Sequence, residues 1–297
     1  MLELDEKKIR KGRPLGLPYQ GSKKKISKKI VEIIKQNFGT EKPVYDIFGG
    51  GGAITAECLL NGLEVHYNDL DETVTSMFQK VVSEDRDYLK TLLVSRDEFF
   101  KIREKENKTV DDELKLLVNS FGNKRRSYLY SKEVSDIKYN LAIEIIKNHD
   151  TFSGYRKTET YLKAPQDFKN QSYQKTRLEQ LERLERLQPL QQLKCLKSTN
   201  LDYTTFSGTD NAILYLDPPY ENAVLEGYSI DGFNSQSFYD WAYEMSKKNA
   251  VLISSYEISD KRFKCVYEFK NARSTLSSGS YYGKRTEKLF MVKKGEE

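Results

Sequence analysis

The sequence predicts an α/β fold, a doubly wound and mostly parallel sheet that ends in an antiparallel hairpin and carries an inserted, mainly helical domain. Two observations predict it. Short apolar runs alternate with segments of helical periodicity near both ends of the chain, as in the βαβ units of a parallel sheet. The middle of the chain is instead charged, helix-prone and rich in Tyr. We therefore expect one domain from residues 1–80 and 195–297, interrupted by a second domain over residues 81–194.

The first part of the sheet is expected before residue 80. Ile residues recur there at helical spacing after a cluster of Lys, and Gly39 offers a stop for that helix. The expected elements are, in order, a helix over 23–38, a strand over 44–48, a glycine turn over 49–52, a helix over 53–60, a strand over 64–67 and a helix from Thr73. This order of strand, turn, helix and strand is the signature of a parallel doubly wound sheet.

The sheet is expected to resume after the insertion. The expected elements are a strand over 213–216, a helix over 237–247, a strand over 250–254 and two further strand-like runs over 263–269 and 288–292. The last two would close a mostly parallel sheet with an antiparallel hairpin. The Ser- and Gly-rich residues 277–285 between them are either a loop near a substrate or a long hairpin connection.

One helix of the insertion is predicted in detail, over residues 174–188. Leu recurs there at every third position, and two pairs of opposite charge stand four residues apart, Glu179 with Arg183 and Glu182 with Arg186. A spacing of three makes an apolar stripe drift around the helix axis. We therefore expect a packed helix rather than a coiled coil.

The composition excludes several classes of protein. Cys58, Cys195 and Cys265 are widely spaced and odd in number, which gives neither a disulfide framework nor a metal motif and fits a cytoplasmic setting. His66 and His149 are the only histidines and lie far apart, so a metal centre or a His-based triad is not expected. No apolar stretch is long enough to span a bilayer. The net charge is only +5, so any case for nucleic acid depends on where the charges lie.

The most informative segment is Asp217-Pro218-Pro219-Tyr220, at the end of a buried strand. It offers a carboxylate that only accepts hydrogen bonds, carbonyls beside residues that cannot donate a backbone N–H, and an aromatic face. Such a set suits gripping an exocyclic amine while stacking on its ring, as in chemistry on a nucleobase. Taken alone, a Pro-Pro turn capped by Asp explains the four residues equally well.

The glycine turn after the first strand is a candidate cofactor site. Gly50 and Gly52 lie where open α/β sheets bind ligands, but the third glycine of a dinucleotide fingerprint is missing. Asp46 beside the turn suits a cationic cofactor such as S-adenosylmethionine better than a pyrophosphate. Asp69, after the second strand, suits a ribose diol. The alternative for an acidic residue here is a cap on the next helix, a role that Asp71 can also fill.

Three segments in this order, Pro18 to Lys23, Asp46-x-Phe48-x-Gly50-x-Gly52 and Asp217 to Tyr220, make the chain resemble the Dam-type DNA adenine-N6 methyltransferases. The resemblance covers about residues 15–75 and 195–292. It implies the methyltransferase sheet with a reversed hairpin, S-adenosylmethionine as cofactor and the insertion as a target-recognition domain for double-stranded DNA.

The resemblance also implies roles for individual residues. The set implied to bind the cofactor is Tyr19, Gly21 and Lys23 near its methionine end, Asp46, Phe48, Gly50 and Gly52 around its pocket, Asp69 at its ribose and Asp202 beside its adenine. For Asp202, a turn or cap role is about as good an interpretation. Asp217 and the carbonyl of Pro218 would accept the two N–H groups of an adenine N6, while Tyr220 would stack on the extruded base. No strong base is needed, because the methylated nitrogen is transiently cationic and acidic.

Two patches of the insertion interleave basic and aromatic residues, as expected of contacts to DNA phosphates and wedges into the base stack. The predicted DNA-binding residues are Lys124, Arg125, Arg126, Tyr128 and Tyr130 in one patch and Arg156 and Lys157 in the other. For any single residue of these patches, an exposed loop whose tyrosine hydroxyls are hydrogen-bonded within the protein is an almost equally good interpretation. Alternatives for the whole chain are an RNA or protein-glutamine N-methyltransferase, or a catalytically silent DNA-binding protein on the same fold.

Overall fold

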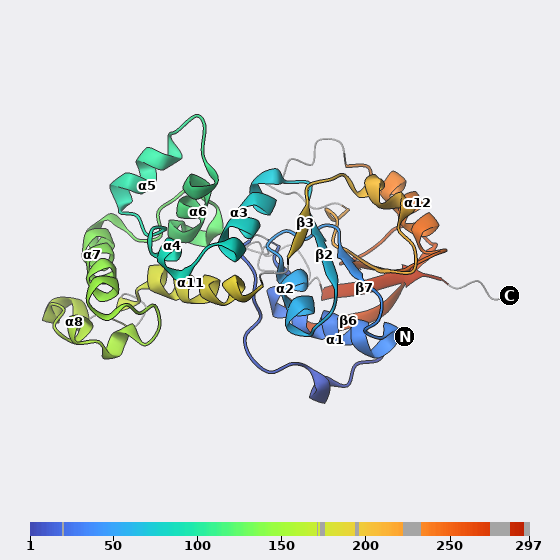
Figure 1. Ribbon diagram of the computed structural model, residues 1–297, viewed down its shortest axis with the longest axis horizontal. Helices are drawn as coiled ribbons and strands as arrows, with labels where there is room; N and C mark the ends of the chain where they lie inside the picture. Colours follow the sequence, from blue (N-terminus) through green and yellow to red (C-terminus); the bar gives the residue numbers. More distant parts are fainter. Residues whose placement is uncertain are drawn as a thin grey trace. The chain divides into compact units, whose positions relative to one another are not determined.

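The computed structural model describes residues 1–19, 21–170, 172, 176–193, 196–221, 233–273 and 286–293 of the chain. The chain forms two compact units. Unit 1 comprises Met1–Pro14, Lys23–Thr75 and Leu196–Glu297, and unit 2 comprises Leu15–Ser22 and Ser76–Cys195. Figure 1 shows the sheet of unit 1 and the helices of unit 2. The predicted loop over residues 277–285 lies outside the described residues.

Unit 1 contains a seven-stranded sheet in the order β3-β2-β1-β4-β5-β7-β6. Its strands are β1 (Val44–Asp46), β2 (Val65–Asn68), β3 (Lys197–Thr199), β4 (Ile213–Leu216), β5 (Ala250–Ser255), β6 (Phe263–Arg273) and β7 (Thr286–Val292). The first five strands pair in parallel, whereas β7 is antiparallel to both β5 and β6. The predicted sheet class and its reversed C-terminal hairpin are confirmed.

Short buried runs specify the centre of this sheet. All four residues of β4 are buried, because the strand is covered on both faces. Val44 of β1 pairs with Val65 of β2 and with Ile213 of β4, so three β-branched side chains stand side by side on one face. The edge strand β3 is short and largely exposed, as suits a sheet edge.

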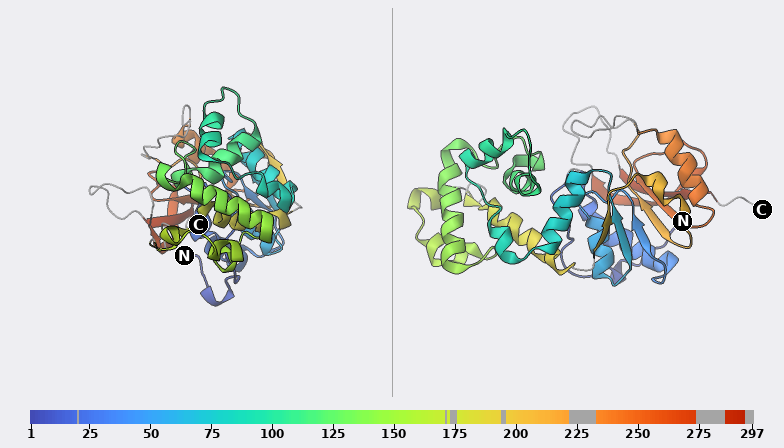
Figure 2. Two further views of the ribbon diagram at one scale, coloured as in Figure 1. Left: turned by 90° about the vertical axis from the view of Figure 1, so that its left-hand side faces the viewer. Right: turned by 45° about the horizontal axis from the view of Figure 1, so that its top comes forward.

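Helices cover both faces of the sheet (Figures 1 and 2). The helices α1 (Ser27–Phe38) and α2 (Ala53–Leu60) pack on the face that carries Tyr215 and Leu252. On the other face α12 (Ser235–Met245) packs against the neighbouring residues of the same strands. Adjacent strand residues point to opposite faces, so β4 contributes to both cores. The described residues of unit 1 also form three short 3₁₀ helices, Glu6–Lys8, Lys23–Lys25 and Tyr203–Gly208.

Unit 2 is helical in its described residues apart from one isolated bridge between Ser120 and Tyr128. The helix α3 (Glu72–Ser83) leads into it from unit 1. The further helices are α4 (Arg86–Lys90), α5 (Arg96–Arg103), α6 (Val110–Asn119), α7 (Lys132–His149), α8 (Glu159–Leu162), α9 (Gln166–Lys169) and α11 (Glu179–Leu187), with 3₁₀ turns at Phe121–Asn123, Tyr155–Lys157 and Gln188–Gln192. Among the described helices of the chain, none is long and apolar enough to cross a membrane.

The helix α11 confirms one prediction and corrects another. The predicted stripe is fully buried in a packed helix and comprises Leu178, Leu181, Leu184 and Leu187. Of the two predicted ion pairs, Glu182 with Arg186 forms at 3.5 Å. The prediction that Glu179 pairs with Arg183 was wrong. Arg183 donates instead to the backbone carbonyls of Leu117 and Val118, both at 3.0 Å, because the last carbonyls of α6 lack partners within their own helix.

Candidate active site at the carboxyl edge of the sheet

Three acidic residues follow the ends of neighbouring parallel strands. Asp46 is the last residue of β1, Asp69 follows β2 and Asp217 follows β4. Since β1 lies between the other two and all three strands run in the same direction, these carboxylates meet at one edge of the sheet. This is the edge at which the sequence predicts a ligand.

Asp217 is the centre of a polar cluster. The ammonium of Lys23 lies 2.7 Å from Asp217 Oδ2. The hydroxyl of Tyr220 lies 3.0 Å from Asp217 Oδ1 and 2.6 Å from Oε1 of Glu287, so its single proton is shared between the two carboxylates. The same ammonium lies 5.0 Å from the centre of the Tyr220 ring. Lys23, Asp217 and Tyr220 thus come together from a 3₁₀ turn and a strand end almost two hundred residues apart in the chain.

Glu287 of β7 is a second carboxylate in this cluster, and it was not predicted. Its Oε1 accepts from the hydroxyl of Tyr220 at 2.6 Å and from that of Ser254 at 2.8 Å. The ammonium of Lys23 lies 3.9 Å from the same oxygen. Glu287 is only 6% exposed, which is unusual for a glutamate without such partners. The sequence signal that could have found it is a charged residue at a position of β7 whose side chain faces the core.

Burial and neighbouring charges determine the protonation of the cluster. Burial raises the pKa of Asp217 to about 6, while Lys23 and the Tyr220 hydroxyl hold it down and Glu287 pushes it up. Burial opposes the charge of Lys23, but the carboxylates of Asp217 and Glu287 outweigh it and raise the pKa of Lys23. Burial also raises the pKa of Tyr220, which therefore remains a hydrogen-bond donor. At neutral pH Asp217 is therefore ionised and lies beside a charged Lys23.

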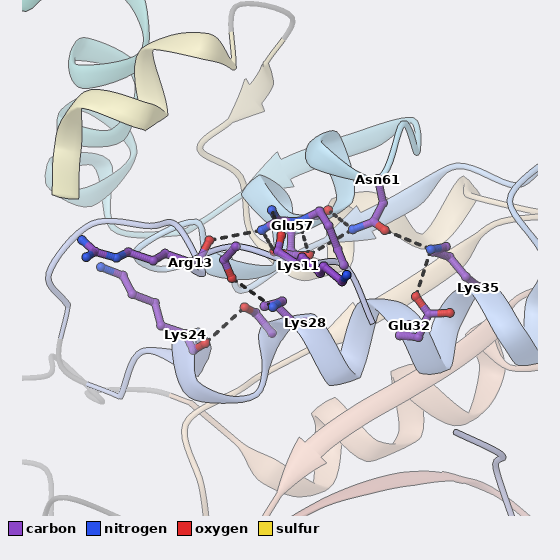
Figure 3. Close-up of polar contacts among 11 residues, drawn as sticks. Lys11, Arg13, Lys24, Lys28, Glu32, Lys35, Glu57 and Asn61 are labelled. Carbon is purple, nitrogen blue, oxygen red and sulfur yellow. Dashed lines mark hydrogen bonds and ion pairs between the residues drawn. The ribbon is translucent and has the colours of Figure 1, made fainter. Parts of the chain in front are cut away.

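Contacts with α1 hold both the turn at Lys24 and the N-terminal arm, residues 1–14 (Figure 3). The hydroxyl of Ser27 donates to the carbonyl of Lys24 at 3.3 Å, and Lys28 donates to the carbonyl of Gly12 at 3.0 Å. Lys29 pairs with Glu6 at 2.5 Å. Lys28 and Lys29 therefore hold the arm against α1.

A network also fixes α2 beside this arm (Figure 3). Glu57 of α2 is fully buried and accepts two hydrogen bonds from Arg10, each at 2.8 Å. Asn61 donates to Glu57 and accepts from Lys35 of α1 at 2.9 Å. A buried carboxylate is tolerated here because it is paired and hydrogen-bonded. The network holds together the three segments that lead into the site.

The glycine turn between β1 and α2 packs closely against β2. The backbone N–H of Gly49 donates to the carbonyl of Asn68 at 2.8 Å, and that of Gly50 donates to Asp69 Oδ2 at 2.7 Å. The hydroxyl of Tyr67 donates to the Gly50 carbonyl at 2.8 Å. A side chain at Gly49 would begin 2.3 Å from the Tyr67 ring, so only glycine fits. Gly52, with φ of 69°, begins α2 in the left-handed region.

Asp46 lies beneath this turn and is 1% exposed. Its Oδ2 accepts from the backbone N–H of Thr55 at 3.1 Å and from the Thr55 hydroxyl at 2.6 Å. Burial raises the pKa of Asp46 to about 7, although these two bonds hold it down. Asp69 also has a raised pKa, because burial outweighs the backbone donors from Asp71 and Gly50. The edge therefore carries three carboxyl groups that favour a cationic partner.

The remaining predicted cofactor residues fall into three places. Phe48 packs edge-on against Phe238 of α12, with ring centres 5.7 Å apart. Asp202 is exposed and caps a 3₁₀ turn, accepting from the backbone N–H of Thr204 at 2.9 Å, which is the cap role considered as an alternative. Tyr19 and Gly21 belong to the segment that groups with unit 2, and their cofactor roles stay predictions.

The comparisons with known proteins identify the family. A family model described as "D12 class N6 adenine-specific DNA methyltransferase" matches residues 19–275. The chain belongs to this family. The predicted resemblance is confirmed, and the protein is an adenine-specific DNA methyltransferase. The RNA, protein-glutamine and catalytically silent alternatives give way to this assignment.

Among solved structures, the methyltransferase is similar to a presumed methylase from Haemophilus influenzae, with 10% sequence identity and a TM-score of 0.34. The alignment covers 95% of this chain and 93% of the other. No curated protein sequence matched the chain. Within the described residues no group of three or more His, Cys, Asp or Glu side chains is arranged to hold a metal ion.

The predicted DNA-binding residues of the methyltransferase separate into exposed and engaged ones. Lys124, Arg126 and Lys157 are exposed. Arg125 pairs with Glu113 of α6 at 2.6 Å. Arg156 is partly buried and donates to the hydroxyl of Tyr161 at 2.8 Å, among other contacts.

The structure corrects the prediction for Tyr128 and Tyr130. Both are 5% exposed, and their rings meet edge to face with centres 6.0 Å apart in the core of unit 2. The Tyr128 hydroxyl donates to the carbonyl of Val94 at 2.9 Å, and that of Tyr130 accepts from the backbone N–H of Gln180 at 3.1 Å. Buried rings with satisfied hydroxyls are core residues and offer no face to a DNA base.

Proposed function

We propose that the protein transfers the methyl group of S-adenosylmethionine to N6 of an adenine that is turned out of duplex DNA, at sites selected by unit 2. The observation that supports this most directly is the buried Asp217 carboxylate beside the Pro218 carbonyl, at the same sheet edge as the glycine turn. One side of this edge suits an amine and the other suits a nucleoside cofactor.

The chemistry of the residues fits S-adenosylmethionine. Asp69 retains lone pairs for ribose hydroxyls in addition to its bonds from Gly50 and Asp71. Asp46 accepts both its hydrogen bonds from described residues through Oδ2, which leaves Oδ1 for a cationic group. The absence of a side chain at Gly49 lets the turn pack against Tyr67 and so fixes the turn backbone at this edge. When bound, the cofactor supplies an electrophilic methyl group.

Asp217 and the Pro218 carbonyl would hold the two N–H groups of the target amine. The adenine N6 lone pair is delocalised into the ring, and acceptors for both N–H groups favour a more tetrahedral and more nucleophilic nitrogen. Because Asp217 is ionised above about pH 6, it can act as such an acceptor at neutral pH. Tyr220 would stack on the base, which replaces part of the stacking lost on extrusion. The chain would then act mainly by alignment and electrostatics.

Unit 2 would supply contacts that position the duplex. Its exposed cations Lys124, Arg126 and Lys157 suit phosphate contacts, which orient a protein on DNA without reading the sequence. The target sequence would then be read by groups that reach base edges.

The test is to bind S-adenosylmethionine to the full chain by calorimetry and then to supply unmethylated duplex DNA and labelled cofactor. We expect saturable binding and N6-methyladenine as the labelled nucleoside, and sequencing of the modified positions would give the target. Base extrusion is tested on duplex DNA that carries 2-aminopurine in place of the target adenine. The fluorescence of the 2-aminopurine should rise when the protein binds the duplex. Cofactor binding without labelled DNA would overturn the proposal, and a flat 2-aminopurine signal would overturn base extrusion.

A further inference from the structure

The Lys23 ammonium occupies the Asp217 carboxylate in the structure, and the proposed reaction needs that carboxylate as an acceptor for the target amine. Lys23 lies on Oδ2 and the Tyr220 hydroxyl on Oδ1. An arriving N–H group competes directly with the Lys23 ammonium, which is a stronger donor than a neutral amine. Each carboxylate oxygen can accept a second hydrogen bond, but the target amine has Oδ2 to itself only when the ammonium shifts away from it.

Glu287 provides a second place for this ammonium. Its Oε1 lies 3.9 Å from Lys23 Nζ, compared with 2.7 Å for Asp217 Oδ2. A movement of little more than the difference between these two distances would turn the longer contact into a hydrogen-bonded ion pair. The lysine ammonium is a compact charge at the end of a flexible four-carbon chain. It can therefore make such a movement without a change in the backbone.

Glu287 is itself held in place. Ser254 and Tyr220 both donate to its Oε1, its side chain is buried, and its strand β7 lies between β5 and β6 in the sheet. The bond from Tyr220 also links Glu287 to the ring that would stack on the base. The position of the second carboxylate is therefore coupled to the position of that ring.

We propose that Glu287 is a positioning residue that takes the Lys23 ammonium from Asp217 when the target amine binds, and that it fixes the Tyr220 ring in the same step. This inference rests on the proposed function. Electrostatics supports it, because moving the ammonium away from Asp217 leaves that carboxylate uncompensated beside the nitrogen that becomes cationic during methyl transfer. With Lys23 on Glu287, the oxygen Oδ2 of Asp217 faces that nitrogen.

The charged and titratable groups that face Asp217 come from several elements. They are Lys23 from the 3₁₀ turn before α1, Asp46 from β1, Tyr215 from β4, Tyr220 from the segment after β4 and Glu287 from β7. Of these, Glu287 raises the pKa of Asp217 and Lys23 lowers it. Removing the charge of Glu287 therefore moves the acidic limb of the rate profile to lower pH.

The test compares single-turnover methyl transfer across pH for the wild type and Glu287→Gln. Gln keeps the shape and can still accept from the Tyr220 hydroxyl, but it cannot pair with an ammonium. We expect a plateau rate about ten- to a hundredfold lower, as for a misplaced reacting group, and an acidic limb at lower pH. Glu244→Gln is the matched control, because Glu244 is exposed on α12 and pairs only with Lys247 among the described residues. It should leave rate and profile unchanged.

The double variant Lys23→Met/Glu287→Gln decides whether the ammonium is transferred. If Lys23 is trapped on Asp217 in Glu287→Gln, its removal should restore part of the plateau rate. A double variant as slow as Glu287→Gln or slower would overturn the proposal, and so would an unchanged rate in Glu287→Gln. A lower plateau with an unmoved acidic limb would also overturn it, since a general packing defect gives that result.

Ser254→Ala provides a second route to the same answer. It removes one donor from Glu287 while leaving both carboxylates and the ammonium in place. We expect a smaller loss of plateau rate with a limb close to that of the wild type, and no loss would count against a fixed Glu287. Failure of the proposed function is distinguishable, because the wild type would then give no N6-methyladenine at all.

Discussion

The ammonium of Lys23 lies 2.7 Å from Asp217 Oδ2, in a cluster that also contains the Glu287 carboxylate. The sequence brings Lys23 and Asp217 into the same prediction only through a family resemblance, and the structure adds their pairing. This contact makes the protonation of Asp217 depend on Lys23, which leads to the first prediction.

Lys23→Met should raise the pKa of Asp217, because the ammonium that holds it down is lost. A raised pKa means that the carboxylate forms only at higher pH, so the acidic limb of the methyl-transfer rate should move upward. At neutral pH the rate should fall, and it should recover in part on raising the pH. Single-turnover rates from about pH 5 to 9, a range that brackets carboxylates perturbed in this way, measure the shift. A limb that stays in place would separate Lys23 from the ionisation of Asp217.

Asp46→Asn should stabilise the free protein near neutral pH and weaken cofactor binding. The pKa of Asp46 is about 7 in the folded protein, well above its ordinary value, so the folded state holds a proton that the unfolded state releases. The free energy of unfolding contributed by this group is therefore present at low pH and is lost as pH rises towards 7. Asn has no titrating proton, so the variant does not lose this free energy as pH rises, and its amide oxygen can still accept hydrogen bonds from Thr55.

Thermal melts at several pH values and calorimetry with S-adenosylmethionine check this prediction. The variant should melt higher at pH 7 than the wild type, and the difference should vanish in acid. Asp202→Asn is the control for the melts, since the Asp202 carboxylate is exposed. A variant that melts lower at pH 7 would contradict the assigned burial cost of Asp46.

Gly49→Ala should destabilise the protein by about 1–3 kcal/mol, the usual cost of overpacking. The added carbon would stand 2.3 Å from the Tyr67 ring, which is fully buried and cannot move aside cheaply. Gly208→Ala is the matched control, because nothing lies within 4 Å of its added carbon. Urea unfolding of both variants provides the comparison. Equal stability of the two variants would mean that the glycine turn is not close-packed.

Lys124→Ala should weaken DNA binding and reduce its dependence on salt. If the exposed ammonium contacts one phosphate, the slope of log affinity against log salt should fall by about one. Arg125→Ala is the comparison, because its guanidinium is paired with Glu113. Fluorescence anisotropy with labelled duplex at several salt concentrations measures both. An unchanged slope in Lys124→Ala would remove this residue from the proposed DNA surface.

The centre of the sheet of unit 1 could be predicted from the sequence because its strands are short buried runs with clear turns, whereas the exposed edge strand β3 has no such run. The strand β4 and the glycine turn after β1 are set by local patterns that do not depend on distant partners. Glu287 could not be found in this way. It lies 70 residues beyond Asp217 in the chain, and it reaches the site only because β7 enters the sheet in reverse.

The two tyrosines of unit 2 show the opposite case. Tyr128 and Tyr130 stand among basic residues, a pattern that favours an exposed DNA surface. Their hydroxyls are satisfied by Val94 and Gln180, which are distant in the chain, and only the packed structure brings these partners together. Arg183 likewise does not form the ion pair predicted within its own helix, and donates instead to a backbone carbonyl at the end of α6. Long-range partners override local pattern at all three positions.

The most direct test of the account is the transfer of labelled methyl from S-adenosylmethionine to duplex DNA by the wild type and by Asp217→Asn, with cofactor binding measured in parallel. Asn keeps the size of the side chain but loses the charge that holds Lys23 and the target amine. We predict N6-methyladenine from the wild type, and turnover lower by at least about a hundredfold in the variant with cofactor binding retained. Wild-type turnover by Asp217→Asn would contradict the assignment of this site to the chemistry.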